Sequence, residues 1–370
     1  MTRVFVAALL LCASFSIATA CPLCLGAFRS PVAQRLVDLP YAVLVQPSTN
    51  GRSYRVIAVI KGERPADEII AAEAIQLDDV MDASATLLLV RDEAWSMWVG
   101  LGAVTVEHAG WLRQIAAGKR SADMNAAEWR TRVVLMLPYL EHREPLVAEI
   151  AYGELAAAPY AALTAAKPRL DALSIRRWLA DPQLMARQPL YLLLLGIAGD
   201  ASDAAALEQR LEALWMARDA TNLASTIAAD LQLRGPSRMA WVDAKYMGDR
   251  LRSTRELEGA LLALSVLGNA NGTIPRERVI LSYRLFMQEH KEFAGLVAWD
   301  LAAWQYWDAV PTYLTLMKSN VRQDFKSRVA VADYLRHSPV GNLIDKDVSE
   351  IGAPDQSTSP ERAAIPVLPQ

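Results

Sequence analysis

The sequence predicts a two-domain α+β protein: a small antiparallel β barrel or sandwich followed by a right-handed α-α solenoid. Before about residue 120, short apolar runs alternate with turn-forming residues, which is typical of strands. From residue 124 on, apolar residues recur with the i, i+3, i+4, i+7 spacing of amphipathic helices. Pairs of these helices follow one another across short turns rich in Asp, Asn and Gly, so we expect them to stack.

Strand patterns account for the first domain. An apolar run at 41–47 ends in the turn-forming residues PSTNG, and an alternating segment at 52–62 ends at a glycine. Residues 66–77 are expected to form a third strand region. The segments 84–93 and 94–104 meet at an acidic corner and are expected to form a hairpin. Roughly five short strands in about 70 residues favour a small barrel or sandwich.

Helical patterns account for the rest of the chain. The segment 107–118 is expected to be a helix that closes the first domain. Asn125, with Glu128 three residues later, has the signature of a capping box and predicts the start of the next helix. Two later helices each carry an apolar stripe, formed by Leu146, Val147, Ile150, Ala151 and Leu155 in the first and by Leu207, Leu211, Leu214 and Trp215 in the second. Each stripe needs a partner surface against which it can be buried.

The two ends of the chain have the composition of a signal peptide and of a tail. Arg3 precedes an apolar run at 4–17, and Ala18 and Ala20 suit cleavage after Ala20. A spanning helix needs about 20 apolar residues, so this run is too short. The final residues contain no aromatic side chain and repeat Pro, Ser and Asp, which predicts disorder. We therefore expect a signal peptide at 1–20, a β domain at 21–120, a helical domain at 124–338 and a disordered tail at 339–370.

Cleavage after residue 20 would leave two cysteines, Cys21 and Cys24, with Cys21 as the first residue. In an oxidising compartment such a pair tends to form a disulfide. Redox catalysis is a weaker hypothesis, because a reactive pair usually starts a helix after a strand and nothing precedes Cys21. Structural zinc would need four ligands. A lipid on Cys21 is the main alternative to the disulfide, and the two exclude each other because both use the same thiol.

Charge and motifs exclude several function classes. The formal net charge is −3 and no basic patch is evident, so nucleic acid is not an expected partner. No nucleophile elbow, phosphate-binding loop or HExxH helix occurs in the sequence. We therefore predict a non-catalytic protein with no cofactor and no metal.

Several polar groups have a structural and a functional interpretation. The cluster of Asp78, Asp79 and Asp82 is expected to be a polar loop, and the segment 345–350 an acidic tail. That segment starts like a calcium loop but has Glu350 where such a loop requires Gly.

Histidines are few, and the densest polar group contains one of them. The four are His108, His142, His290 and His337, and their spacing forms no metal motif. The group Glu141 to Glu144 is expected to be a charged corner between two helices, closed by Pro145. The alternative is an acid/base pair made of His and Glu.

Aromatic residues are densest at Trp299, Trp304, Tyr306 and Trp307. Trp304 and Trp307 are predicted to share a helix face. The simplest interpretation is a core between helices, since wide rings fill such layers. An exposed group would instead mark a partner surface, so Trp299, Trp304 and Trp307 are the candidate partner-binding residues.

Three segments near the N-terminus resemble the netrin-like module of metalloproteinase inhibitors: CPLC, then YAVLVQ, then YRVIAVIKG. The resemblance covers Cys21 to Val104. It implies an OB-type barrel in which one strand closes in a Lys-Gly turn, here Lys61 and Gly62. Modules of that family usually tie their N-terminal cysteines to distant ones, and this chain has no distant cysteine.

The whole layout resembles an uncharacterised group of bacterial exported proteins that begin with CPxC. The resemblance is carried by CPLC, VIAVIKG, YLEHREPLVAEIAYGELAAAPY and WLADPQLMARQPLYLLLLGIAGD. The helical part is similar to HEAT repeats. The group implies no known activity.

These observations predict an exported, non-catalytic binding or scaffold protein, periplasmic or secreted, that docks a protein partner on its helical repeat surface. One alternative is an exported thiol-disulfide protein that uses Cys21 and Cys24, and another is a netrin-like protease inhibitor. Membrane attachment is expected only if Cys21 is lipidated, which would give a lipid-anchored envelope protein.

Overall fold

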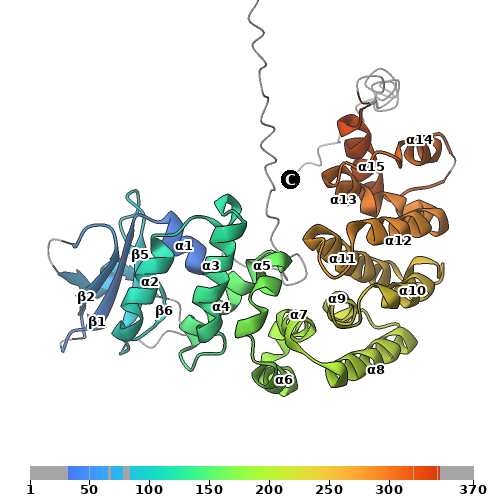
Figure 1. Cartoon of the computed structure of the whole chain (residues 1–370). Coiled ribbons are helices and arrows are strands. Elements are labelled where there is room, and N and C mark those ends of the chain that lie inside the picture. The colour runs from blue at the N-terminus through green and yellow to red at the C-terminus, as the bar shows by residue number, and fades with distance from the viewer. Residues whose placement is uncertain are drawn as a thin grey trace, which may run out of the picture. The chain divides into compact units, whose positions relative to one another are not determined.

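The computed structural model describes residues 32–49, 51–65, 68–77, 84–319, 321–339 and 341. A small sheet near the N-terminus is followed by a largely helical region (Figure 1). The strands are β1 (Tyr41–Pro47), β2 (Ser53–Lys61), β3 (Ile69–Ala71), β4 (Ile75–Gln76), β5 (Leu87–Arg91) and β6 (Trp98–Ala103). The helices are α1 (Val32–Asp38), α2 (Ala109–Ala116), α3 (Ala126–Met136), α4 (Pro145–Ala157), α5 (Tyr160–Ala165), α6 (Ala172–Ala180), α7 (Gln188–Ala198), α8 (Ala201–Ala217), α9 (Leu223–Arg234), α10 (Met239–Val242), α11 (Thr254–Ala270), α12 (Arg276–Glu289), α13 (Ala298–Ala303), α14 (Val310–Lys318) and α15 (Phe325–His337). The chain is therefore an α+β protein, as the sequence predicts.

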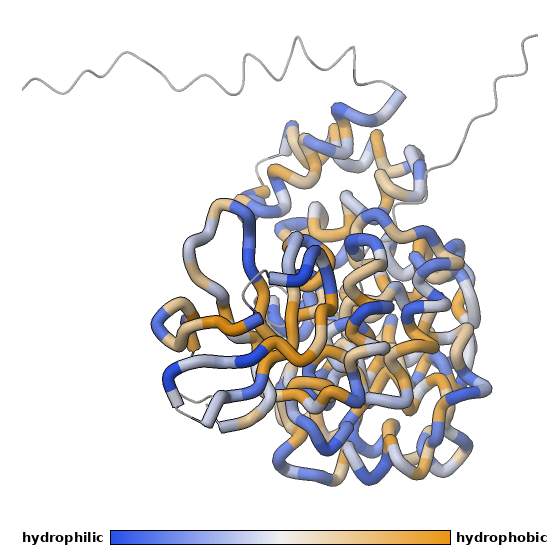
Figure 2. The backbone as a smooth tube through the Cα atoms, turned by 90° about the vertical axis from the view of Figure 1, so that its left-hand side faces the viewer, coloured by the Kyte–Doolittle hydropathy of each residue, from blue (hydrophilic) through white to orange (hydrophobic). Residues whose placement is uncertain are grey.

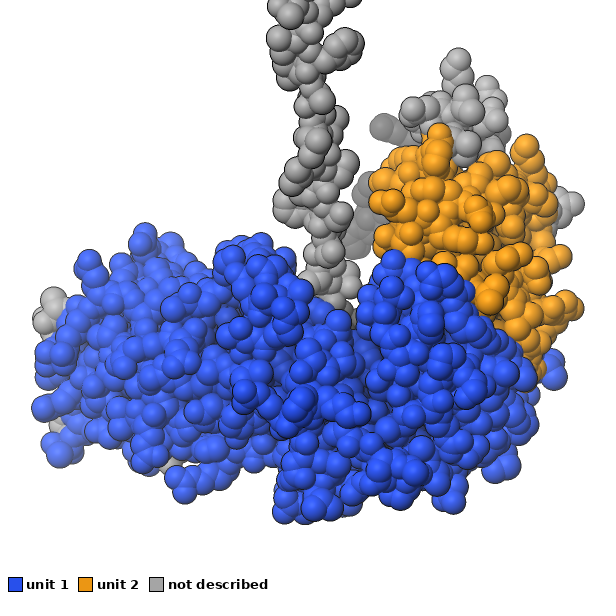
Figure 3. Space-filling view, viewed as in Figure 1, with its two compact units in different colours: residues 1–246, 251–279 blue, residues 247–250, 280–370 orange. Residues whose placement is uncertain are grey.

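Contacts between Cα atoms divide the chain into two compact units (Figure 3). Unit 1 holds residues 1–246 and 251–279, and unit 2 holds residues 247–250 and 280–370. Unit 1 therefore contains the whole sheet and the helices up to α11. The predicted domain boundary between residues 120 and 124 is a statement about which part of the chain folds independently. The two compact units do not test it, so it stays a prediction.

The sheet has six strands in the order β3-β2-β1-β5-β6-β4. Its two edge strands, β3 and β4, are consecutive in the chain and are joined by one 3-10 turn, Ala72–Ala74. This short connection brings the chain from one edge to the other and nearly closes the sheet. The predicted third strand region is thus two short strands rather than one.

One pairing departs from the predicted antiparallel sheet. The pairs β1–β2, β1–β5, β2–β3 and β5–β6 are antiparallel, whereas β4 pairs with β6 in parallel. The reason is that the chain passes from β3 through the 3-10 turn into β4 without reversing direction. The predicted hairpin of 84–93 and 94–104 is confirmed by the β5–β6 pairing.

The sheet encloses an apolar core formed by Val43, Val45, Tyr54, Val56, Ile70, Ile75, Leu87, Leu89 and Trp98. On the opposite face of β1, Ala42 and Leu44 are also fully buried. Helix α2 packs on β2 and helix α4 packs on β6, so the sheet has a covered outer face as well. Burial on both faces explains why β1 is a continuous apolar run instead of an alternating one. Figure 2 shows the hydrophobic strands against their hydrophilic loops.

The predicted Lys-Gly turn ties the sheet to α1. The Lys61 ammonium donates hydrogen bonds to the carbonyl oxygens of Leu36 and Val37 in the last turn of α1. Burial lowers the pKa of Lys61. Gly62 follows with φ +79°, and a Cβ there would lie 2.5 Å from the Pro40 carbonyl oxygen. The helix end and the turn are therefore in direct contact, and no larger residue fits at position 62.

Capping confirms the predicted start of α3. The Asn125 side chain accepts hydrogen bonds from the amides of Ala127 and Glu128, and the Glu128 carboxylate accepts one from the Asn125 amide at 2.8 Å. Helix α4 begins at Pro145, as expected of a corner closed by that proline. Its predicted stripe is buried, but so are Ala148, Tyr152 and Glu154, because α4 packs on α1, α3 and β6 at once.

Helices in the middle of unit 1 pack in pairs. Helix α6 packs on α7, and α8 packs on α9. Helix α9 also packs on α7, so the second helices of these two pairs are neighbours, and α9 packs on α11 as well. The α7–α9 approach is close, since a Cβ at Gly196 would lie 2.5 Å from the Ala229 Cα.

Three helices start with a capping box whose carboxylate also binds a basic side chain. The boxes are Asn125–Glu128, Asp200–Asp203 and Ser253–Glu256, and the bases are Lys119 at 2.7 Å, Arg176 at 2.7 Å and Arg252 at 2.9 Å. Each of these carboxylates therefore accepts a hydrogen bond from the start of its own helix and another from a basic side chain of a neighbouring segment or turn.

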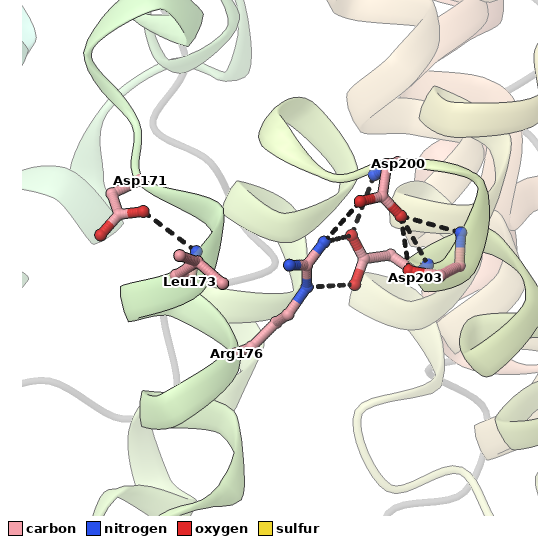
Figure 4. A network of polar contacts seen from close by, with 6 residues as sticks. Asp171, Leu173, Arg176, Asp200 and Asp203 are labelled. Atoms are coloured by element: carbon pink, nitrogen blue, oxygen red, sulfur yellow. Dashed lines mark hydrogen bonds and ion pairs between the residues drawn. The ribbon is translucent and has the colours of Figure 1, made fainter.

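The Arg176 junction connects two helices (Figure 4). Arg176 of α6 donates to both oxygens of Asp203, at 2.8 and 2.7 Å, and to Asp200 at 2.8 Å. Hydrogen bonds from the side chain and amide of Ser202 lower the pKa of Asp200 to about 2. The Arg176 hydrogen bonds lower the pKa of Asp203. Both carboxylates are consequently ionised over the physiological range of pH.

Substitution Gly62→Ala should destabilise the protein more than Gly51→Ala. Both glycines have positive φ, but a Cβ at Gly51 meets nothing within 4 Å. The control, Gly51→Ala, should lower the free energy of unfolding by about 1 kcal/mol from left-handed strain alone. Gly62→Ala should lower it by about 1–3 kcal/mol more, because its Cβ overpacks against the Pro40 carbonyl. Urea unfolding measures both free energies, and equal losses would show that the Pro40 contact is not tight.

Lowering the pH should weaken the Arg176 junction. The carboxylate pKa values are lower in the folded chain than the unfolded value of about 3.9, so their contribution is complete above pH 4 and is lost as pH falls to about 2. We therefore expect the free energy of unfolding to fall less between pH 5 and pH 2 in Arg176→Gln than in the wild type. Urea unfolding at a series of pH values measures this difference. Lys167→Gln, an exposed change elsewhere, should follow the wild type, and an unchanged slope in Arg176→Gln would contradict the assignment.

Candidate functional site

Several predicted residues lie outside the described part of the chain. These include Cys21 and Cys24, so the disulfide, redox and lipid hypotheses stay predictions. The same holds for the signal peptide, for the segment 345–350 and for the acidic cluster of Asp78, Asp79 and Asp82.

The candidate partner-binding tryptophans do not form one surface stripe. Helix α13 ends at Ala303, and Gln305 has the left-handed φ of +56°. The prediction that Trp304 and Trp307 share a helix face is therefore wrong, because the chain turns between them. Trp299, on α13, exposes 43% of its surface.

Trp304 and Trp307 each pack against a tyrosine of a different helix. The Trp304 ring lies parallel to that of Tyr283 on α12, with centroids 5.6 Å apart. The Trp307 ring lies 5.2 Å from that of Tyr334 on α15. These contacts anchor both ends of the segment 304–307.

A cleft of about 200 Å³ lies beside that segment, between α12 and the start of α14. Met287 and Ala309 are its buried residues. Its polar lining comes from Arg284 and Gln288 on α12 and from Tyr306, Asp308 and Thr312 on the opposite wall. Within the described residues, neither Arg284 nor Asp308 has an ion-pair partner. The cleft thus presents one free cation and one free anion.

The polar corner at Glu141 to Glu144 divides between two networks. Glu141, with a left-handed φ of +58°, accepts hydrogen bonds from Arg187 and from the Tyr191 hydroxyl. Arg187 also lies over the Tyr152 ring, 5.0 Å from its centroid. Burial raises the pKa of Tyr191, which therefore stays a hydrogen-bond donor. Glu141 thus joins the corner to α7, in the structural role expected of it.

His142 and Glu144 belong to the second network, together with Thr105 and His108. The Glu144 carboxylate accepts from the Thr105 amide and from the Thr105 hydroxyl, both at 2.9 Å. His108 Nδ1 lies 3.2 Å from the Thr105 hydroxyl and 3.6 Å from Glu144 Oε2. His142 Nδ1 accepts from the Glu144 amide at 3.2 Å. The two imidazole rings are perpendicular, with centroids 4.9 Å apart.

The network keeps Glu144 charged. Burial acts to raise the pKa of Glu144, but the two Thr105 hydrogen bonds and the neighbouring histidine rings outweigh it and hold that pKa below its usual value. His108 is 8% exposed, and its ring packs against those of Trp111 and Tyr139. One side of the site is therefore an aromatic wall.

The alternative interpretation of the corner, an acid/base pair of His and Glu, is not formed by the side chains of His142 and Glu144. His142 contacts the backbone amide of Glu144, while the carboxylate turns toward His108. Two of the four histidines, His108 and His142, are thus brought together, because α2, α3 and the turn after it return the chain to the end of β6. No local spacing signals a contact between residues 34 positions apart.

Comparison with known proteins finds no matching family model, no matching curated protein and no matching solved structure. Among the described residues, no helix is both long and apolar enough to cross a membrane. The function must consequently be argued from the residues themselves.

Substitution Thr105→Val should raise the pKa of Glu144 toward the ordinary value of about 4.3. The variant loses the hydroxyl that donates to Glu144 Oε1 but keeps the backbone donor. Carbon-13 NMR titration of the Glu144 carboxyl measures this pKa. Thr131→Val, which loses a hydroxyl that donates to the Ala127 carbonyl, should leave it unchanged, and an unchanged pKa in Thr105→Val would refute the role of the hydroxyl.

Proposed function

We propose that this chain is an exported, non-catalytic binding protein that docks a protein partner on its helical part. The observation that carries the proposal is the cleft between α12 and α14, where neither Arg284 nor Asp308 has an ion-pair partner in the described part of the chain. Export rests on the signal-like residues 1–20.

The packing of the helices supports a right-handed, HEAT-like solenoid. Helices α6 and α8 each pack on the helix that follows, the second helices α7 and α9 are neighbours, and α9 packs in turn on α11. In solenoids each repeat contacts mainly its neighbours, and the extended surface that results serves binding. The nearly closed sheet is in keeping with a barrel-like first domain, for which an OB-type, netrin-like fold stays our proposal.

Opposite charges on the two walls of the cleft define the partner chemistry. The Arg284 guanidinium presents planar donors suited to a carboxylate. Asp308 accepts from an ammonium or guanidinium group, and Tyr306, Gln288 and Thr312 add neutral polar groups. A peptide segment with one acidic and one basic side chain fits this arrangement. Arginine and tyrosine are also enriched at the energetic centres of interfaces.

The packing of Trp304 and Trp307 against tyrosines prepares the cleft for binding. Each ring is held by a tyrosine, so the segment that carries Tyr306 and Asp308 is fixed at both ends. A preorganised wall avoids part of the ordering cost of association. The thiol-disulfide and protease-inhibitor alternatives depend on residues 21–24, which are not among the described residues, and they stay predictions.

Charge reversal in the cleft should abolish partner binding. Full-length mature protein would be used for crosslinking and affinity capture from the native cell envelope. A protein captured by the wild type should be lost from Arg284→Glu and from Asp308→Lys. With that protein purified, each variant should raise Kd at least about tenfold, or about 1.4 kcal/mol.

The matched control is Arg328→Glu, an exposed arginine of α15 outside the cleft. It should capture the same protein with the same Kd as the wild type. Equal binding by the wild type and both cleft variants would refute the cleft as the docking site.

A further inference from the structure

Two histidines and a glutamate from separate parts of the sequence converge at the start of α4. One potential ligand atom of each of His108, His142 and Glu144 lies within 4.8 Å of the others. We infer that these three residues bind a divalent transition-metal ion of the zinc class. The inference is independent of partner docking at the cleft in unit 2.

The donor set suits such an ion. Imidazole nitrogen and carboxylate oxygen bind zinc at about 2.0–2.2 Å, and three protein ligands plus one water is a common arrangement. Ligand atoms of a tetrahedral site are then about 3.4 Å apart, from this bond length and tetrahedral geometry. The distance from His108 Nδ1 to Glu144 Oε2 is 3.6 Å. Since no pair exceeds 4.8 Å, adjustments on the order of 1 Å would complete the site.

Thr105 prepares Glu144 as a ligand. Its amide and hydroxyl each hold one carboxylate oxygen, so the side chain is oriented before any ion arrives. Each oxygen keeps a further lone pair for a metal. Thr105 therefore acts as a positioning residue, in the way that outer-shell donors orient the ligands of known metal sites.

The hydrogen bonds at the histidines are replaceable. The Thr105 hydroxyl donates its proton to Glu144, so in its 3.2 Å contact with His108 the hydroxyl oxygen is the acceptor and His108 Nδ1 the donor. A metal ion would take the position of the Nδ1 proton, which would then be carried by Nε2 or released. His142 Nδ1 accepts only one long bond, 3.2 Å, from the Glu144 amide. An ion-nitrogen bond would replace it.

The surroundings favour a partly sheltered ion. His108 is almost fully buried, the Glu144 side chain is 15% exposed, and His142 is half-buried, so the ion would enter past His142.

The test uses the full mature chain, freed of metal by a chelator and titrated with Co²⁺ and Zn²⁺. The wild type should bind one ion, and Co²⁺ should give the intense visible absorption of a tetrahedral site. His142→Gln and Glu144→Gln should each weaken binding at least about tenfold. Loss of a residue that only orients a ligand already weakens metal binding by about that factor, and these variants remove a ligand itself. Far-UV circular dichroism checks that each variant is folded. Because His142 is only half-buried, His142→Gln is the variant least expected to disturb folding.

Two controls make the result specific. His337→Gln removes an exposed histidine whose Nδ1 also lies 3.6 Å from a carboxylate, that of Asp333, but with no third ligand; it should bind as the wild type does. A Cys21→Ser, Cys24→Ser double variant should keep the Co²⁺ spectrum. The proposal is overturned if no ion binds, if His142→Gln binds normally, or if the cysteine variant loses the ion.

Discussion

Helix N-termini need acceptors for their free N–H groups, and in this protein the carboxylates that supply them also join neighbouring segments. An N-cap contributes about 1 kcal/mol, and an exposed ion pair contributes less. Glu128, Asp203 and Glu256 combine both functions, because each completes a capping box and binds Lys119, Arg176 or Arg252. Short helices are marginal alone, so a group that caps one helix while holding a second segment stabilises their packing, as Asp203 does when it joins α8 to Arg176 of α6.

Glu144 departs from this arrangement, and the departure coincides with the proposed metal site. It occupies the N-cap position of α4, yet its side chain makes no capping hydrogen bond. Pro145 follows and has no N–H, so the helix start has one donor fewer to satisfy. The carboxylate is left for Thr105 and His108. Departures from local rules are expected where a residue serves function, and here the same residue that forgoes capping completes a set of metal ligands.

Contacts between aromatic rings hold a segment of unit 2 in place, whereas capping boxes join segments in unit 1. Trp304 and Trp307 lie on either side of a chain turn and pack on Tyr283 and Tyr334. These contacts hold the segment that forms one wall of the cleft. The aromatic group noted in the sequence therefore supports two interpretations at once: two of its rings are packing residues, and Tyr306 between them faces a candidate docking site.

Local patterns in the sequence determined β1, β2, the β5–β6 hairpin and the Asn125 cap, because strand alternation and the capping box each involve only a few adjacent residues. The seven-residue helix α1 escaped notice, since so short a segment carries no clear period. Only the tertiary structure decided the near-closure of the sheet and the parallel β4–β6 pair. It also decided the separation of Glu141 from Glu144 and the meeting of His108 with His142. Those contacts join residues whose sequence spacing carries no signal, because packed helices, not the intervening number of residues, set the distance between them.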